Sequence, residues 1–387
     1  MNVRIDPFSA SGKITAPPSK SFAHRYIIAA FLSGSKCVID NVGDSDDVNA
    51  TINAVKSLGA KIEKQGGRVT VFGRRFVDNV VVNCGESGST MRFLIPVAAA
   101  LGIRAEFTGA GRLMSRPIED LSRAINGRGA EIAGHSVSGK LSGGAYYLDA
   151  SLSSQFVSGM LFALSAISGE SEIILKGARV SKGYIDITLS VLKEFGVKVA
   201  EMERGYKVFG GYNPPEKVTV EGDWSGAAFP LAIGALTGDV TVLNLKYPTL
   251  QSDGAILNIL EKFGAKVSAC KGSVRVKKGE LFGIDSIDCE NFPDIAQVIS
   301  AVAAFSQGVT RLTGVKRLKI KESDRIAAII DQLKTCGIRA EYDGETLTVY
   351  GGAPSGGRFD GGKDHRTVMS AAVIAAAANG VSEISGA

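Results

Sequence analysis

Cationic residues stand at the predicted start of an apolar helix near the N-terminus. The stretch PPSKSFAHR, residues 17–25, places Lys20 and Arg25 directly before the apolar run YIIAAFL. The two prolines keep the preceding backbone extended, and one of the serines can cap the helix. Free N–H groups and the dipole of a helix N-terminus favour an anion, and the two cations add to this preference. An ordinary helix start with solvated charges would show the same pattern, so the rest of the chain must decide.

Polar and charged residues also stand at the predicted starts of later helices. If equivalent helices point the same way, their polar first residues converge on a site for several anionic groups at once. Few acids interrupt this set, and Asp294 and Glu322 are the candidates for proton transfer. The recurring residues are Gly88, Ser89, Arg92, Arg116, Ser153, Ser154, Gln155, Ser181, Tyr184, Asp294, Lys321, Glu322, Arg325, His365 and Arg366.

The helices that carry these residues belong to a sixfold repeat. Six apolar helices of small residues each begin at a polar residue and run to a glycine, with successive glycines 68, 67, 69, 70 and 72 residues apart by subtraction. A second, amphipathic helix and a short alternating strand follow, so the unit is predicted as strand–helix–strand–helix–strand–strand. The first helices carry almost no charge, which predicts an α/β fold with its helices buried inside. The glycines, expected as left-handed caps, are Gly34, Gly102, Gly169, Gly238, Gly308 and Gly380.

Composition excludes several classes of protein. The 387 residues are 45% hydrophobic and 21% charged, with a net charge of +5, as in an ordinary globular chain of two or three domains. No block of five or six like charges occurs, and Lys and Arg are not interleaved with aromatics, so nucleic-acid binding is not expected. No apolar stretch is long enough to span a bilayer, and no signal peptide is recognisable. The five cysteines form no CxxC pair, which indicates free thiols in a reducing cytoplasm.

Two other kinds of site are also not expected. The three histidines are not spaced as zinc ligands, so no metal site is predicted. The segment GRFDGGKD nearly fits a phosphate-binding P-loop, but Asp364 stands where the magnesium-binding Ser or Thr belongs. No GxGxxG motif opens a strand–helix–strand unit.

The chain resembles the 5-enolpyruvylshikimate-3-phosphate (EPSP) synthase, or 3-phosphoshikimate 1-carboxyvinyltransferase, family. The matching motifs occur in order over nearly the whole chain: PPSKSFAHR, GESGSTMR, SRPI, SSQF, SKGYIDIT, NFPDIAQ, IKESDR and KDHR. The resemblance implies a two-domain inside-out α/β barrel of six βαβαββ-type repeats, with the active site in the interdomain cleft. It implies an N-terminal domain at residues 18–222 and a C-terminal domain at residues 1–17 and 223–387.

The resemblance also implies a reaction. The enolpyruvyl group of phosphoenolpyruvate passes to the 5-hydroxyl of shikimate 3-phosphate through a tetrahedral intermediate, and phosphate leaves, in chorismate and aromatic amino acid biosynthesis. No cofactor is expected, because phosphoenolpyruvate already carries the reactive enol. The expected catalytic residues are Asp294 as the base for the hydroxyl, Glu322 as the candidate proton donor to the methylene, and Lys20.

The resemblance further implies which residues bind each substrate. Shikimate 3-phosphate is assigned to Lys20, Ser21, Arg25, Ser153, Ser154, Ser181, Asp294 and Lys321. Phosphoenolpyruvate is assigned to Lys20, Gly88, Arg116, Gln155, Arg325 and Arg366. The herbicide glyphosate is expected to compete with phosphoenolpyruvate.

Two alternatives stay open. The first is the sister enolpyruvyl transferase that acts on UDP-N-acetylglucosamine, although Lys20 is followed here by Ser21 and the loop GAGRLMSRPI has no cysteine. The second is a non-catalytic module that binds anions or nucleic acid. The chain also departs from relatives at two positions: Glu86 stands where many relatives have Asn, and Arg317 stands where some relatives have Asn. Its sixth repeat is expected to be incomplete, without a last strand, a last helix and a lysine that contacts phosphoenolpyruvate in relatives. The protein is expected to be a cytoplasmic monomer.

Overall fold

The chain folds into two compact units in the computed structural model, which describes residues 2–151, 153–177, 180–362 and 364–387. The N-terminal unit comprises residues 18–221, and the C-terminal unit comprises residues 1–17 and 222–387. The N-terminal domain expected from the sequence ends at Gly222, one residue later than the N-terminal unit of the structure. Gly222 lies with the C-terminal unit because its carbonyl accepts a hydrogen bond from Gln251 Nε2 at 2.8 Å. A Cβ on this glycine would also collide with the carbonyl oxygen of Asn244.

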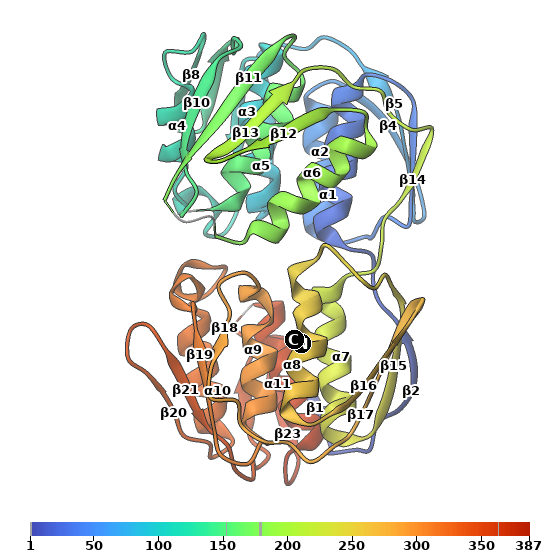
Figure 1. The fold of residues 1–387 in the computed structure, drawn as a ribbon, viewed down its shortest axis with the longest axis vertical. Helices are drawn as coiled ribbons and strands as arrows, with labels where there is room; N and C mark the ends of the chain where they lie inside the picture. The colour runs from blue at the N-terminus through green and yellow to red at the C-terminus, as the bar shows by residue number, and fades with distance from the viewer. Residues whose placement is uncertain (1, 152, 178–179, 363) are drawn as a thin grey trace. The chain divides into compact units, whose positions relative to one another are not determined.

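Three four-stranded sheets form the outside of the N-terminal unit (Figure 1). In each sheet the first two strands run parallel and the others antiparallel. The sheets are β14 (Lys217–Thr219), β3 (Cys37–Asp40), β5 (Arg68–Arg74), β4 (Ala60–Gln65); β6 (Val80–Asn83), β7 (Ala105–Thr108), β9 (Ser136–Gly139), β8 (Ala130–Ala133); and β10 (Ala145–Asp149), β11 (Glu170–Lys176), β13 (Gly205–Phe209), β12 (Lys198–Met202). The helices are α1 (Lys20–Ser33), α2 (Asp46–Ser57), α3 (Gly88–Leu101), α4 (Glu119–Ile125), α5 (Ser154–Ser165) and α6 (Lys182–Glu194).

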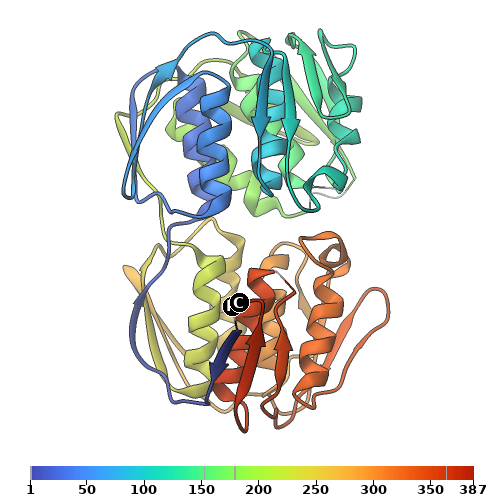
Figure 2. The ribbon, with the colours of Figure 1, turned by 180° about the vertical axis from the view of Figure 1, so that it is seen from behind.

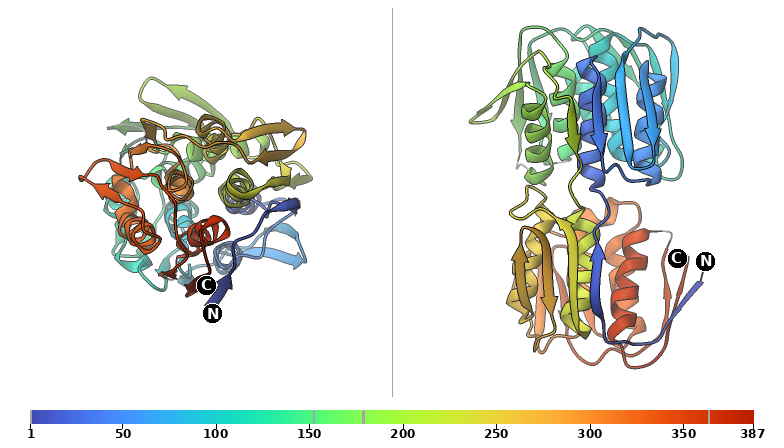
Figure 3. Two further views of the ribbon diagram at one scale, coloured as in Figure 1. Left: turned by 90° about the horizontal axis from the view of Figure 1, so that it is seen from below. Right: turned by 90° about the vertical axis from the view of Figure 1, so that its right-hand side faces the viewer.

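The C-terminal unit follows the same plan, except that one of its three sheets has three strands (Figure 2). Strand β1 pairs with β23, so the two ends of the chain lie side by side in one sheet (Figure 3). The sheets are β16 (Lys266–Cys270), β17 (Gly272–Lys277), β15 (Asp239–Leu245), β2 (Ser11–Thr15); β18 (Ile287–Asp288), β19 (Val309–Thr313), β21 (Leu347–Tyr350), β20 (Ala340–Tyr342); and β1 (Asn2–Ile5), β23 (Ser382–Ser385), β22 (Arg358–Asp360). The helices are α7 (Trp224–Thr237), α8 (Ile256–Phe263), α9 (Ala296–Ala303), α10 (Arg325–Thr335) and α11 (His365–Ala377).

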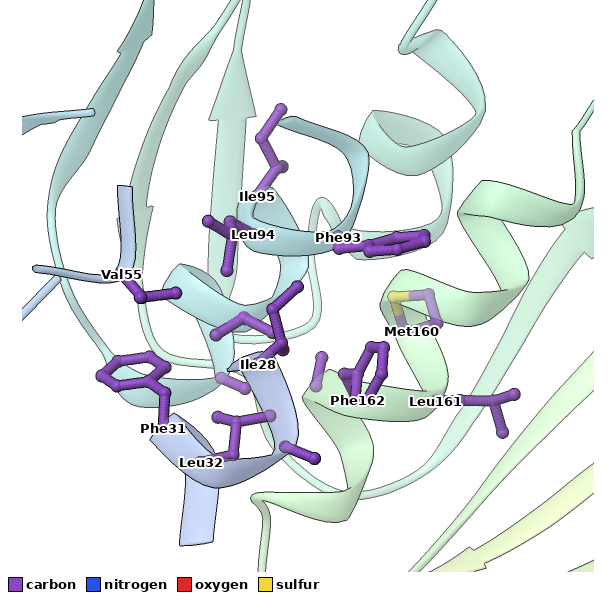
Figure 4. Packing of buried hydrophobic residues seen from close by; sticks show 14 of the residues in the cluster. Ile28, Phe31, Leu32, Val55, Phe93, Leu94, Ile95, Met160, Leu161 and Phe162 are labelled. Carbon is purple, nitrogen blue, oxygen red and sulfur yellow. The ribbon is translucent and has the colours of Figure 1, made fainter. Parts of the chain in front are cut away.

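Helices fill the centre of each unit, and the sheets cover them. In the N-terminal unit, α1, α3 and α5 meet through side chains such as Ile28, Phe93 and Met160 (Figure 4). The rings of Phe93 and Phe162 lie 5.9 Å apart. These helices are apolar on nearly every side, and a helix of that kind is stable only when it is buried all round. The predicted fold class, with buried helices and repeated α/β units, is confirmed.

The glycines at the ends of the first helices have two different roles. Gly34 and Gly102 end α1 and α3 in the left-handed conformation, with φ of 66° and 71°. Gly238 ends α7 with extended φ, and a Cβ there would collide with the carbonyl oxygen of Ala10. The prediction of a left-handed cap is therefore wrong for α7, where glycine permits a close approach of two backbone segments. Gly169, Gly308 and Gly380 do have positive φ, of 90°, 97° and 104°, but α5, α9 and α11 end before them, so the prediction that they cap these helices is wrong.

Candidate active site

At the start of α1, two predicted cations are held by other helices. Lys20 Nζ lies 2.7 Å from Asp47 Oδ2 on α2. Arg25 is buried, and its Nε donates to Thr188 Oγ1 at 2.7 Å while Nη2 donates to the carbonyl of Tyr184 at 3.0 Å. Burial lowers the pKa of Arg25 to about 10, so the guanidinium stays charged at neutral pH. Arg25 therefore fixes α1 against α6 and adds a positive charge beside Lys20.

The start of α3 has open backbone donors. The Ser87 hydroxyl accepts the N–H of Thr90 at 3.3 Å and so caps the helix. Among the described residues, no acceptor binds the N–H groups of Gly88 and Ser89. A Cβ on Gly88 would lie 2.7 Å from Nη1 of Arg116, so that guanidinium lies against the same helix end. Open N–H groups beside a guanidinium are an arrangement that binds phosphate or carboxylate.

The start of α5 is tied to α3 by an oriented amide. Gln155 Nε2 donates to Ser89 Oγ at 2.9 Å, and its Oε1 accepts from Arg92 Nη1 at 2.7 Å. Arg92 also donates to the carbonyl of Pro117 at 3.2 Å. The Ser153 hydroxyl caps α5 by accepting from the backbone N–H of Gln155 at 3.2 Å. These bonds fix the orientation of the Gln155 amide at the start of α5.

Two further predicted serines lie at helix starts of the same unit. Ser154 is the buried first residue of α5. Ser181 precedes α6 with φ of 52°, in the left-handed region that a residue with a Cβ adopts at a cost of roughly 1–2 kcal/mol. Strain of this kind is typical of functional sites. The N-terminal unit thus brings the predicted residues to the starts of α1, α3, α5 and α6.

The C-terminal unit surrounds Asp294 with cations. Asp294 lies in the 3₁₀ turn Pro293–Ile295 before α9, with its side chain 15% exposed. Its Oδ1 lies 2.9 Å from Arg325 Nη1, 3.5 Å from Lys321 Nζ and 3.7 Å from Arg366 Nε. The structure therefore brings together four residues that the sequence places on three separate motifs.

Arg325 is the centre of this cluster and is almost completely buried. Its Nε lies 2.9 Å from Asp364 Oδ2, and its Nη2 lies 2.9 Å from Glu322 Oε2. Burial by itself raises the pKa of Asp364, but Arg325 lowers it to about 2. Burial also raises the pKa of Glu322, and Arg325 and Lys321 together lower it below its usual value. Both carboxyl groups are therefore ionised when no substrate is bound.

The prediction from sequence missed two acidic residues of this unit. Asp364 caps α11 by accepting the N–H of Arg366 at 3.0 Å, and an Asp directly before an apolar helix is a signal that could have indicated it. Asp253 lies in the short 3₁₀ helix Ser252–Ala255, is 4% exposed, and its Oδ1 has no hydrogen-bond partner among the described residues. Burial, and then Asp294, raise the pKa of Asp253 to about 7. No sequence pattern indicates a buried carboxyl at this position.

The described ranges contain neither a metal-binding cluster nor a membrane-spanning helix. Within them, no three His, Cys, Asp or Glu side chains are grouped to hold a metal ion. None of the helices in these ranges is both long and apolar enough to cross a membrane.

Known proteins match this chain over nearly its full length. The model of the EPSP synthase (3-phosphoshikimate 1-carboxyvinyltransferase) family matches residues 6–386. The 3-phosphoshikimate 1-carboxyvinyltransferases of Clostridium kluyveri and Clostridium novyi are 37% and 35% identical, each over 96% of this chain and 90% of the relative. A solved structure of EPSP synthase from Acinetobacter baumannii matches with a TM-score of 0.84 at 26% identity, over 100% of this chain and 94% of that one. Because sequence, relatives and fold agree, the chain belongs to the EPSP synthase (3-phosphoshikimate 1-carboxyvinyltransferase) family.

Proposed function

We propose that the polar helix starts described above bind shikimate 3-phosphate and phosphoenolpyruvate. As a member of its family, the chain transfers the 1-carboxyvinyl group of phosphoenolpyruvate to the 5-hydroxyl of shikimate 3-phosphate and releases phosphate. Each substrate carries a phosphate and a carboxylate, which need cations and open N–H groups. The observation that carries the proposal is the contact of Asp294 with Lys321, Arg325 and Arg366.

The binding roles follow the chemistry of each helix start. The open N–H group of Gly88 and the adjacent guanidinium of Arg116 suit the phosphate of phosphoenolpyruvate. Gln155, Arg325 and Arg366 are assigned to the same substrate through the family resemblance. Shikimate 3-phosphate is assigned to Ser21, Arg25, Ser153, Ser154, Ser181, Asp294 and Lys321, and Lys20 is assigned to both substrates.

In the proposed mechanism, Asp294 accepts the proton of the 5-hydroxyl as that oxygen attacks C2 of phosphoenolpyruvate. A proton reaches C3 from Glu322, which gives a tetrahedral intermediate. The intermediate then loses phosphate from C2 and returns a proton from C3 to the Glu322 carboxylate, which restores the double bond. The positive charge of Lys20 stabilises the leaving phosphate.

Glu322 must gain a proton before it can act as an acid. Its pKa is held low by Arg325 and Lys321 in the free protein. Bound phosphate and carboxylate groups would neutralise these two cations and add negative charge. Both effects raise the pKa of a nearby carboxyl group, so substrate binding itself prepares Glu322 as the acid.

Release of inorganic phosphate tests the proposed reaction. We expect release only when both substrates are present, and none when either is omitted. Replacing shikimate 3-phosphate with UDP-N-acetylglucosamine should abolish release. Phosphate release with the nucleotide sugar would identify the sister transferase, and binding without any release would identify an anion-binding module.

We further propose that the chain acts as a monomer in the cytoplasm, without a nucleic-acid partner. Its five cysteines are unpaired, and four of them are buried, which suits a reducing compartment. Light scattering of the purified protein tests the oligomeric state, and a dimer mass would overturn that part of the proposal.

A further inference from the structure

Four buried side chains form a continuous hydrogen-bonded chain across α1, α2 and α3. His24 Nδ1 lies 2.6 Å from Thr51 Oγ1, which lies 2.6 Å from Thr90 Oγ1. The Thr90 hydroxyl in turn donates to Ser87 Oγ at 2.7 Å. All four residues are at most 2% exposed, so water does not compete for these bonds. We call these four residues the His24–Ser87 chain.

The protons of the His24–Ser87 chain can be assigned link by link. Because Thr90 donates its hydroxyl proton to Ser87, the 2.6 Å contact requires Thr51 to donate to Thr90. This contact is shorter than the alternative from Thr51 to the carbonyl of Asp47, at 3.3 Å. Nδ1 of His24 must then carry the proton that Thr51 accepts. Burial lowers the pKa of His24 to about 3, so the ring is neutral and this is its single proton.

The two ends of the His24–Ser87 chain lie at two predicted substrate-binding positions. His24 follows Lys20 by one helical turn, and the Lys20 ammonium pairs with Asp47, one turn before Thr51 on α2. At the other end, Ser87 caps α3 and directly precedes Gly88. The His24–Ser87 chain therefore connects α1, which carries Lys20, to the start of α3, where the N–H groups of Gly88 and Ser89 are open.

We propose that the His24–Ser87 chain positions the Gly88 N–H group relative to Lys20 and thereby sets the affinity for the phosphate of phosphoenolpyruvate. This inference rests on the proposed function of the two helix starts. The four members are positioning residues, because Lys20 and the Gly88 backbone, rather than these side chains, are assigned to the substrate. Such a role predicts a change in the KM for one substrate, whereas a merely structural role predicts only a change in stability.

Thr51→Val tests the proposal, because valine keeps the shape of threonine and removes the hydroxyl. We expect the KM for phosphoenolpyruvate to rise about three- to tenfold, the effect of losing one hydrogen bond. The kcat and the KM for shikimate 3-phosphate should change less than about twofold, and Thr51→Ser should restore the wild-type KM.

Thr310→Val is the matched control. Thr310 is also buried, and its hydroxyl accepts a hydrogen bond from the N–H of Ile284 at 3.1 Å in the other unit. This variant should lose thermal stability without a change in the KM for phosphoenolpyruvate. An unchanged KM in Thr51→Val, or an equal rise in Thr310→Val, would overturn the proposal. Absence of phosphate release in the wild-type protein would instead contradict the proposed function.

A second readout does not depend on activity. The chain has three histidines, so NMR of protein labelled with ¹⁵N-histidine gives few signals, and a His24→Gln variant identifies the signal of His24. We expect a neutral ring protonated on Nδ1 between about pH 5 and pH 8, and a change of tautomer in Thr51→Val. A His24 ring that titrates near its ordinary pKa, or that carries its proton on Nε2 in the wild-type protein, would overturn the proposal.

Discussion

The carboxylate of Asp294 is the residue on which the proposed chemistry depends most. Asp294→Asn keeps the shape of the side chain but cannot accept the hydroxyl proton, so we expect kcat to fall by ~10²–10⁴-fold. Substrate affinities should change far less. Steady-state kinetics measure both, with Asp285→Asn as the control, because Asp285 forms an exposed pair with Arg311 in the same unit. A kcat near that of the wild type in Asp294→Asn would refute the role of base.

The space around Gly88 gives a second prediction at the residue scale. A methyl group on Gly88 would lie 2.7 Å from Nη1 and 3.1 Å from Cζ of Arg116, so the guanidinium must move away. We expect Gly88→Ala to raise the inhibition constant of glyphosate, a competitor longer than phosphoenolpyruvate, more than it raises the KM of the substrate. Gly67→Ala is the control, since its Cβ would meet only an ordinary contact at 3.7 Å. If inhibition by glyphosate were unchanged, Gly88 would not line the site.

At the scale of elements, Asp364 has two separable functions, because it caps α11 and pairs with Arg325. Asp364→Asn keeps a good cap and removes the charge, which should lower the free energy of unfolding by ~1.5–3 kcal/mol. Asp364→Ala loses the cap as well, at a further cost of ~1 kcal/mol. Urea denaturation, followed by the fluorescence of Trp224, the single tryptophan, reports unfolding of this unit.

Asp324 provides the matched control for this pair of variants. It caps α10 by accepting the N–H of Ala327 at 3.1 Å, and its side chain is exposed. Asp324→Asn should therefore be nearly neutral, and Asp324→Ala should show the cost of the cap alone. Equal stabilities of Asp364→Asn and Asp364→Ala would argue against a capping role for Asp364.

At the scale of the whole molecule, Asp253 should make stability depend on pH. Its pKa is about 7 in the folded chain against 3.8 in the unfolded chain. The raised pKa contributes stability below about pH 4, and this contribution is lost as the pH rises towards 7. The free energy of unfolding of Asp253→Asn should therefore rise relative to that of the wild type by roughly 2.7 kcal/mol between about pH 5 and pH 8, since the wild type loses 1.36 kcal/mol for each of about two pH units below 7.

Urea denaturation of both proteins at several pH values tests this expectation through Trp224 fluorescence. Other groups, such as Asp364 with its pKa of about 2, titrate alike in both proteins and cancel in the difference. If the free energies of unfolding of the wild type and of Asp253→Asn changed in parallel between about pH 5 and pH 8, Asp253 would be ionised in the folded chain.

The sequence alone determined the repeat, the burial of the first helices and the chemistry of their starts. These features are local, because a period of 3.6 residues, a cap and a run of small residues act within one element. Lys20, Gly88, Asp294 and Arg325 could therefore be singled out, and the fold class could be predicted from six similar helices.

Only the tertiary structure decided which side chains meet. Arg325 contacts Asp364, 39 residues away, and Thr51 contacts Thr90 on another helix, also 39 residues away. The tertiary structure also decided where α5, α9 and α11 end and that Asp253 is buried, because packing between elements sets both features. Such partners depend on how helices approach one another, and no pattern within a single element carries that information.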